Sequence, residues 1–79
     1  MGHRQKTVSG LLMEVEGNRR VVLAGCKGIL TYTEECVRMR IGGGAVAIYG
    51  QRLEMGCMTA EGAVVTGLVQ RIEFEQEGL

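Results

Sequence analysis

The sequence contains no proline, no tryptophan and no aspartate, and its only histidine is His3. Its aromatic side chains are Tyr32, Tyr49 and Phe74, and nine basic side chains balance nine acidic ones. A neutral chain has no overall electrostatic attraction to nucleic acid or to an anionic membrane, and few aromatics leave few surfaces for base stacking. Composition therefore argues against nucleic acid as the main partner.

Long hydrophobic runs are also missing. Every uninterrupted apolar segment is far shorter than the ~20 residues that a helix needs to cross a bilayer. The charged residues near the N-terminus are not followed by the apolar stretch of a signal peptide. We therefore expect a cytoplasmic protein that does not insert into the membrane directly.

The cysteines are three in number, Cys26, Cys36 and Cys57, with no Cys-x-x-Cys pair. An odd number at these spacings does not suit a disulfide framework, and reduced thiols are expected. Their spacing matches no structural zinc pattern, and His3 is the only other strong ligand. Cys36 has no neighbouring base to activate it. The sequence thus predicts no metal, no cofactor, no catalytic residue and no enzymatic activity.

Glycine is abundant, with thirteen residues, and short alternating runs lie between the glycines. From Val37 to Ile41 apolar and charged residues alternate, which is typical of a strand with Arg38 and Arg40 on one face. The triplet Gly42–Gly44 follows, and Ala45–Tyr49 continues as a second strand-like run. A short glycine loop between two such runs predicts a β-hairpin.

Turn signals recur about every 8 to 12 residues along the chain, and no segment has a clear helical period. The sequence therefore predicts one all-β domain of about seven short antiparallel strands, arranged as a sandwich, a roll or a partly open barrel. Turns are expected at 16–18, 33–35 and 50–51, and a bulge or bend at Gly67. A short helix over Thr33–Met39 remains an alternative, because Thr33 could cap it.

The domain is expected over residues 11–75, between a flexible N-terminal segment, 1–10, and a short acidic tail, 76–79. A chain of this size buries only about 60% of its unfolded surface, so a lone core is marginal. Short strands flanked by glycine also leave sheet edges open. Self-association into a homo-oligomer is therefore expected.

Three pentapeptides share one pattern, with arginine second and a charge fourth: Val37–Ile41, Gln51–Met55 and Gln70–Phe74. They could form a repeat that stacks arginines in a row, or they could simply be amphipathic strands that look alike. Their unequal spacing does not suit a solenoid.

If these strands are neighbours, four guanidinium groups gather on one candidate partner-binding face. Its members are Arg38, Arg40, Arg52 and Arg71. Such a face could bind an acidic protein segment or RNA phosphates. The alternative is an ordinary solvated surface on which Glu54 and Glu73 balance the arginines.

Four segments together resemble a known family. They are Val22–Tyr32, Val37–Ile41, Ala47–Met55 and Val65–Phe74, and their order and glycine positions are similar to those of the YabP/YqfC family of sporulation proteins. The resemblance extends over about residues 11–75. The glycine triplet at 42–44 and the three cysteines depart from the usual members.

The resemblance implies a small non-enzymatic protein made during endospore formation, in the cytoplasm of the mother cell or the forespore. Because the YqfC type is encoded beside a larger membrane protein, a membrane protein is one candidate partner. A structural or scaffolding role through protein–protein contacts is therefore expected. The alternative, suggested by the short strands and arginines, is a small β-barrel RNA-binding protein.

Overall fold

The computed structural model describes residues 3–8, 11–56 and 62–76. All regular structure in these residues is β-strand, which confirms the all-β prediction. The strands are β1 (His3–Val8), β2 (Leu11–Glu16), β3 (Arg20–Ala24), β4 (Gly28–Tyr32), β5 (Cys36–Ile41), β6 (Gly44–Gly56) and β7 (Gly62–Gln76). No helix in the described ranges could span a membrane.

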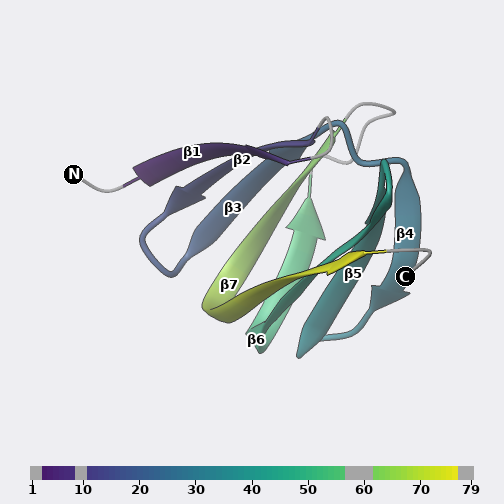
Figure 1. The fold of residues 1–79 in the computed structure, drawn as a ribbon. Coiled ribbons are helices and arrows are strands. Elements are labelled where there is room, and N and C mark those ends of the chain that lie inside the picture. Colours follow the sequence, from purple (N-terminus) through teal and green to yellow (C-terminus); the bar gives the residue numbers. More distant parts are fainter. Residues whose placement is uncertain (1–2, 9–10, 57–61, 77–79) are drawn as a thin grey trace.

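The strands form a single antiparallel sheet in the order β1-β2-β3-β7-β6-β5-β4. Figure 1 shows that the two long strands, β6 and β7, occupy the middle and that β1 and β4 form the edges. β1 lies inside the segment 1–10, for which the sequence indicated no strand, and it pairs with β2 from His3↔Glu16 to Val8↔Leu11.

The predicted hairpin joins β5 to β6. Ile41 pairs with Gly44, and Gly43 has a φ of 85°, so the turn consists of Gly42 and Gly43 alone. Gly43 can adopt this left-handed conformation because glycine has no Cβ. The hairpin is thus confirmed with a turn one residue shorter than the glycine triplet.

The helical alternative for Thr33–Met39 is wrong. The Thr33 hydroxyl accepts hydrogen bonds from the backbone N–H groups of Glu35 and Cys36, at 3.2 and 3.0 Å. This turn spans residues 33–35, as expected, and β5 begins directly after it at Cys36. A threonine side chain that satisfies the backbone of a turn competes here with helix formation.

The expected turn at 50–51 is also wrong, because β6 continues through it, and β6 and β7 are not short strands. Gln51 pairs with Leu68 and Glu54 with Thr66, so β6 contains one residue more than β7 in that interval. A second irregularity follows Tyr49. Such bulges bend a strand and increase its twist.

The bend of the long strands depends on glycine. Gly67 has a φ of 129°, and a Cβ there would lie 2.5 Å from the carbonyl oxygen of Arg52. A Cβ on Gly50 would overlap the carbonyl oxygen of Leu68. The bend predicted at Gly67 is confirmed, and the two strands approach each other there more closely than side chains would allow.

The bend divides the sheet into two halves. The β4–β5 half contains β4, β5, residues 44–50 of β6 and residues 69–76 of β7, and the β1–β3 half contains β1–β3 with the remaining parts of both long strands. In Figure 1 both β6 and β7 run from one half into the other. The described core lies between the halves and takes side chains from each. Its fully buried large members are Leu23, Met39, Ile48, Leu53, Val21, Val37, Val46 and Val65.

Candidate functional site

The candidate site is the outer face of the β4–β5 half, opposite the core. Because Val37 and Met39 point into the core, Arg38 and Arg40 on the same strand point outward. Their partners on β6 are Ala47 and Ala45, and the next partners on β7 are Glu73 and Glu75. We call this surface the arginine face, with members Arg38, Arg40, Arg71, Glu73 and Glu75.

Two small side chains lie at the centre of the arginine face. Ala45 and Ala47 are 5% and 0% exposed, yet neither belongs to the cluster of core residues between the halves. Each is flanked by long charged side chains of β5 and β7. The alanines are therefore buried on the outer side of the sheet, beneath those chains, whose aliphatic stems can cover apolar surface.

Arg38 and Glu75 form an ion pair that crosses β6. Arg38 Nε donates to Glu75 Oε2 at 3.2 Å and Arg38 Nη2 to Oε1 at 2.6 Å, a bidentate contact between side chains that are 33% and 39% exposed. The hydrogen bond lowers the pKa of the Glu75 carboxyl below its usual value, against a smaller opposing effect of burial. The same hydrogen bond, with the charge of Glu75, raises the pKa of Arg38.

Arg71 is held by two neighbours. Its Nε lies 2.8 Å from Glu73 Oε2, and its guanidinium carbon lies 4.3 Å from the centre of the Tyr49 ring, which is the β6 partner of Arg71. A cation over an aromatic ring at this distance is attracted by the ring electrons. Both side chains of the ion pair are about half exposed, so Arg71 lies at the surface with two contacts that favour this orientation.

Arg40 differs from the other two arginines. It is exposed, and no ion pair of the described residues includes it. Its neighbours on either side are Gly28 of β4 and Ala45 of β6, neither of which has a charge. Arg40 is therefore an exposed cation that makes no ion pair with the other described residues, so its guanidinium can face a carboxylate of a partner.

The structure does not bring Arg52 to this face. Arg52 lies in the bend of β6 with a φ of 55°, a left-handed conformation that is uncommon for a residue with a side chain. It lines a pocket of about 440 Å³ together with Arg19, Gln51, Gly67 and Leu68. Of the four predicted arginines, three thus lie on the arginine face, and Arg52 lies at the bend of β6.

One member of the face, Glu75, and one neighbour that holds Arg71, Tyr49, were missed by sequence reasoning. Glu75 was assigned to the end of the domain, and Tyr49 was counted only among the few aromatic side chains. The alternation Glu73-Phe74-Glu75 was the available signal, because it continues the period of β7 and places both carboxylates on one side.

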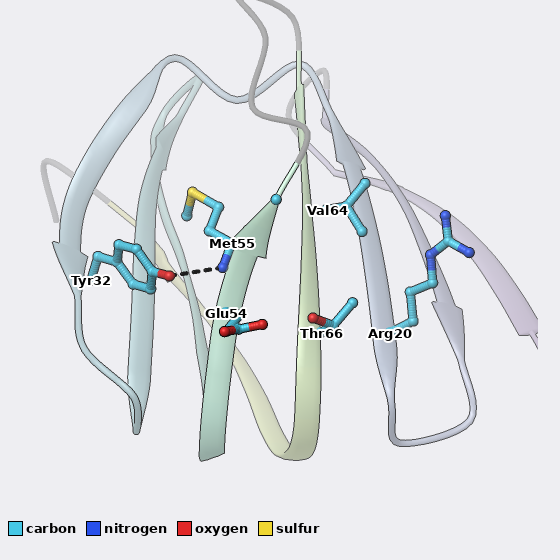
Figure 2. Close-up of a pocket in the computed structure, with 7 residues that line it drawn as sticks. Arg20, Tyr32, Glu54, Met55, Val64 and Thr66 are labelled. Carbon is cyan, nitrogen blue, oxygen red and sulfur yellow. Dashed lines mark hydrogen bonds between the residues drawn. The ribbon is translucent and has the colours of Figure 1, made fainter.

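A second concavity lies on the outer face of the β1–β3 half, with a volume of about 490 Å³. Figure 2 shows Tyr32 reaching from β4 toward β6, where its hydroxyl accepts a hydrogen bond from the Met55 backbone N–H at 3.0 Å. Arg20 lines the opposite side and makes an ion pair with Glu16 at 3.7 Å. Glu54 and Thr66 form the floor, so no single ligand chemistry is favoured there.

The two cysteines among the described residues lie in different environments. Cys26 is buried in the core, and Cys36 is half-buried opposite Tyr49. Cys57 lies outside the described residues. Within the described ranges, no group of three or more potential metal ligands is present.

The fold and the arginine face define a class: a small all-β domain with a charged face on the outer side of its sheet. The family model of the YabP family matches residues 7–78. The chain therefore belongs to the YabP family, in agreement with the resemblance found in the sequence. Comparison with curated proteins and with solved structures gave no match.

Proposed function

We propose that this chain is a non-enzymatic protein of endospore formation that binds a protein partner through the arginine face. Membership of the YabP family over residues 7–78 supports the link to sporulation. The place of action would be the cytoplasm of the mother cell or forespore, where the chain would have a structural or scaffolding role through contacts of the arginine face.

The observation that carries the binding proposal is Arg40. Its exposed guanidinium lies on the same face as the Arg38–Glu75 and Arg71–Glu73 ion pairs. These pairs favour one arrangement of their side chains, which lowers the cost of ordering them when a partner binds. A carboxylate that docks on Arg40 would form a bidentate charge-assisted contact.

The partner chemistry that suits this face is a protein segment with at least one carboxylate opposite Arg40 and hydrogen-bond donors opposite Glu73. A charged pattern of both signs favours specific pairing over general attraction to anions. A membrane protein that exposes such a segment would bring the chain to a membrane without direct insertion.

The RNA-binding alternative has less support on this face. Glu73 and Glu75 place two carboxylates among three arginines, and Tyr49 already stacks on Arg71. RNA phosphates would be repelled by those carboxylates, and the tyrosine ring would have to leave its cation to stack on a base. An acidic protein segment with its own donors therefore suits the face better.

The test is a charge reversal at Arg40. We expect Arg40→Glu to fold normally, because the residue is exposed, and to lose retention of the partner in pull-downs from sporulating cells. Arg19→Glu makes the same charge change in the turn between β2 and β3 and serves as the matched control. The same variants, expressed in place of the wild-type chain in the endospore-forming host, report on the number of heat-resistant spores.

A protein retained by wild type and Arg19→Glu but not by Arg40→Glu, with and without nuclease, would support the proposal. Equal retention by folded Arg40→Glu would contradict the use of this face. Loss of all retained proteins after nuclease, with RNA recovered before it, would favour the RNA-binding alternative. Unchanged spore numbers in cells that lack the chain would contradict the sporulation role.

A further inference from the structure

We propose that two copies of this chain associate through β4, pairing antiparallel so that their two sheets join into one. This inference stands apart from the function proposed above, because it concerns an edge of the sheet and not the arginine face.

The exposed edge of β4 is open to pairing. β4 pairs with β5 on one side, and no strand of the described residues pairs with its other side. Its sequence, Gly-Ile-Leu-Thr-Tyr, contains neither a charge nor a proline. Edge strands of monomeric proteins commonly contain charged residues or proline, and these residues discourage pairing with another chain. β4 contains no residue of either kind.

The core is also incomplete along β4. Ile29 pairs with Met39 and Tyr32 with Val37, so both face the core side of the sheet. Yet Ile29 and Tyr32 are 46% and 50% exposed, whereas Met39 and Val37 are completely buried. Leu30, at the irregularity between them, is 41% exposed. Apolar surface continuous with the core thus remains uncovered on this side.

The charges before β4 are opposite in sign to the charges after it, so the two ends of the strand are complementary when two copies pair antiparallel. Lys27 precedes the strand, and Glu34 and Glu35 follow it. All three are exposed, and none belongs to an ion pair within the described ranges. In an antiparallel pair centred on Leu30, Lys27 of each copy would lie beside the glutamates of the other. A parallel pair would bring like charges together.

A second copy is the occupant that these observations favour. An interface with two-fold symmetry requires one patch that is complementary to itself, and an apolar strand with a basic start and an acidic end meets that condition. A strand from an unrelated partner that paired antiparallel would need the same order of charges, basic before the strand and acidic after it.

β4 is positioned before association. The hydrogen bond from the Met55 backbone N–H to the Tyr32 hydroxyl ties the end of β4 to β6, as Figure 2 shows. The backbone of the following turn is also fixed, because the carbonyl groups of Glu34 and Glu35 accept hydrogen bonds from Leu53 and Gly50, at 2.8 and 3.0 Å. A preformed edge loses little conformational freedom on pairing.

The first test is sedimentation equilibrium of the full chain at low salt. We expect twice the mass of one chain for the wild type and a single-chain mass for Leu30→Glu, which places two carboxylates at the centre of the contact. Leu68→Glu is the matched control, because Leu68 is 36% exposed at the bend of β7 and away from β4. It should remain dimeric.

A wild-type chain that stays monomeric at about millimolar concentration would overturn the proposal. Dimers of folded Leu30→Glu with wild-type affinity would do so as well. Larger assemblies that persist in Leu30→Glu would also overturn it, because they would form without the β4 contact.

The second test exchanges charges and does not depend on how Leu30→Glu folds. Lys27→Glu alone makes both ends of β4 acidic, and Glu34→Lys with Glu35→Lys makes both ends basic. Each variant alone should dimerise about tenfold more weakly than wild type. An equimolar mixture should regain the wild-type affinity as a heterodimer, because acidic ends then face basic ends. A mixture no tighter than either variant alone would overturn the antiparallel β4 contact.

Discussion

At the scale of single residues, the arginine face depends on its smallest side chains. Ala45 and Ala47 lie on the strand between β5 and β7 and are buried on the outer side of the sheet. Their size lets Arg38 reach Glu75 across that strand within hydrogen-bond distance. A longer side chain at either position would occupy the path of the ion pair. The alanines therefore determine the layout of the charges above them.

The Arg38–Glu75 pair predicts a pH dependence of stability. Because its pKa is lowered in the folded state, Glu75 releases its proton more readily in the folded chain than in the unfolded one. The stabilisation is therefore complete above the usual glutamate value of 4.5 and is lost as the pH falls through the lower folded-state value. The cost of Glu75→Gln, measured by urea unfolding, should be larger at about pH 7 than at about pH 3.

The control for this prediction is Glu54→Gln. Glu54 is exposed and belongs to no ion pair of the described residues, so this change measures the loss of a charge alone. An equal cost of Glu75→Gln at both pH values would contradict the assigned role of the ion pair.

The sequence predicted part of the candidate site. Period-two alternation placed Arg38 and Arg40 together, because alternation alone decides which residues of one strand share a face. It could not separate Arg52 from Arg71, because that depends on an extra residue in β6 and on a left-handed conformation at Arg52. The sequence pattern shared by the three pentapeptides does not show that Arg52 lies away from the other arginines in the folded chain.

At the scale of elements, the bend of β6 and β7 converts one sheet into two packed halves. The glycines at the bend were visible in the sequence, and Gly67 was identified as a bulge or bend. Gly50 was taken for a turn, because glycine followed by a polar residue commonly ends a strand. Only the pairing of β6 with β7 on both sides of the bend keeps the strand continuous. That pairing is long-range and has no local signal.

Gly67 provides the prediction at this scale. We expect Gly67→Ala to lower the free energy of unfolding by about 2 kcal/mol or more, because a Cβ would meet the Arg52 backbone at a φ of 129°. Urea unfolding monitored by circular dichroism measures the change. Gly28→Ala is the control, since nothing lies within 4 Å of a Cβ there. Similar midpoints for the two variants would show that the bend does not require glycine.

At the scale of the whole molecule, the two halves of the sheet share their stability. β6 and β7 run through both halves, and the described core draws large side chains from each, such as Leu23 from one and Met39 from the other. Neither half could keep its apolar face covered if the other separated. We therefore expect a single cooperative unfolding transition, as is usual for a domain of this size.

Cys26 allows this expectation to be measured. Cys26 is 6% exposed and belongs to the core cluster, whereas circular dichroism follows the strands of both halves. In a chain with Cys36→Ser and Cys57→Ser, thiol labelling of Cys26 and the loss of β-sheet signal should have the same urea midpoint. Labelling at a clearly lower urea concentration would mean that the core opens while most strands persist. In that case the bend would act as a hinge between two separable halves, and the long strands would not couple them.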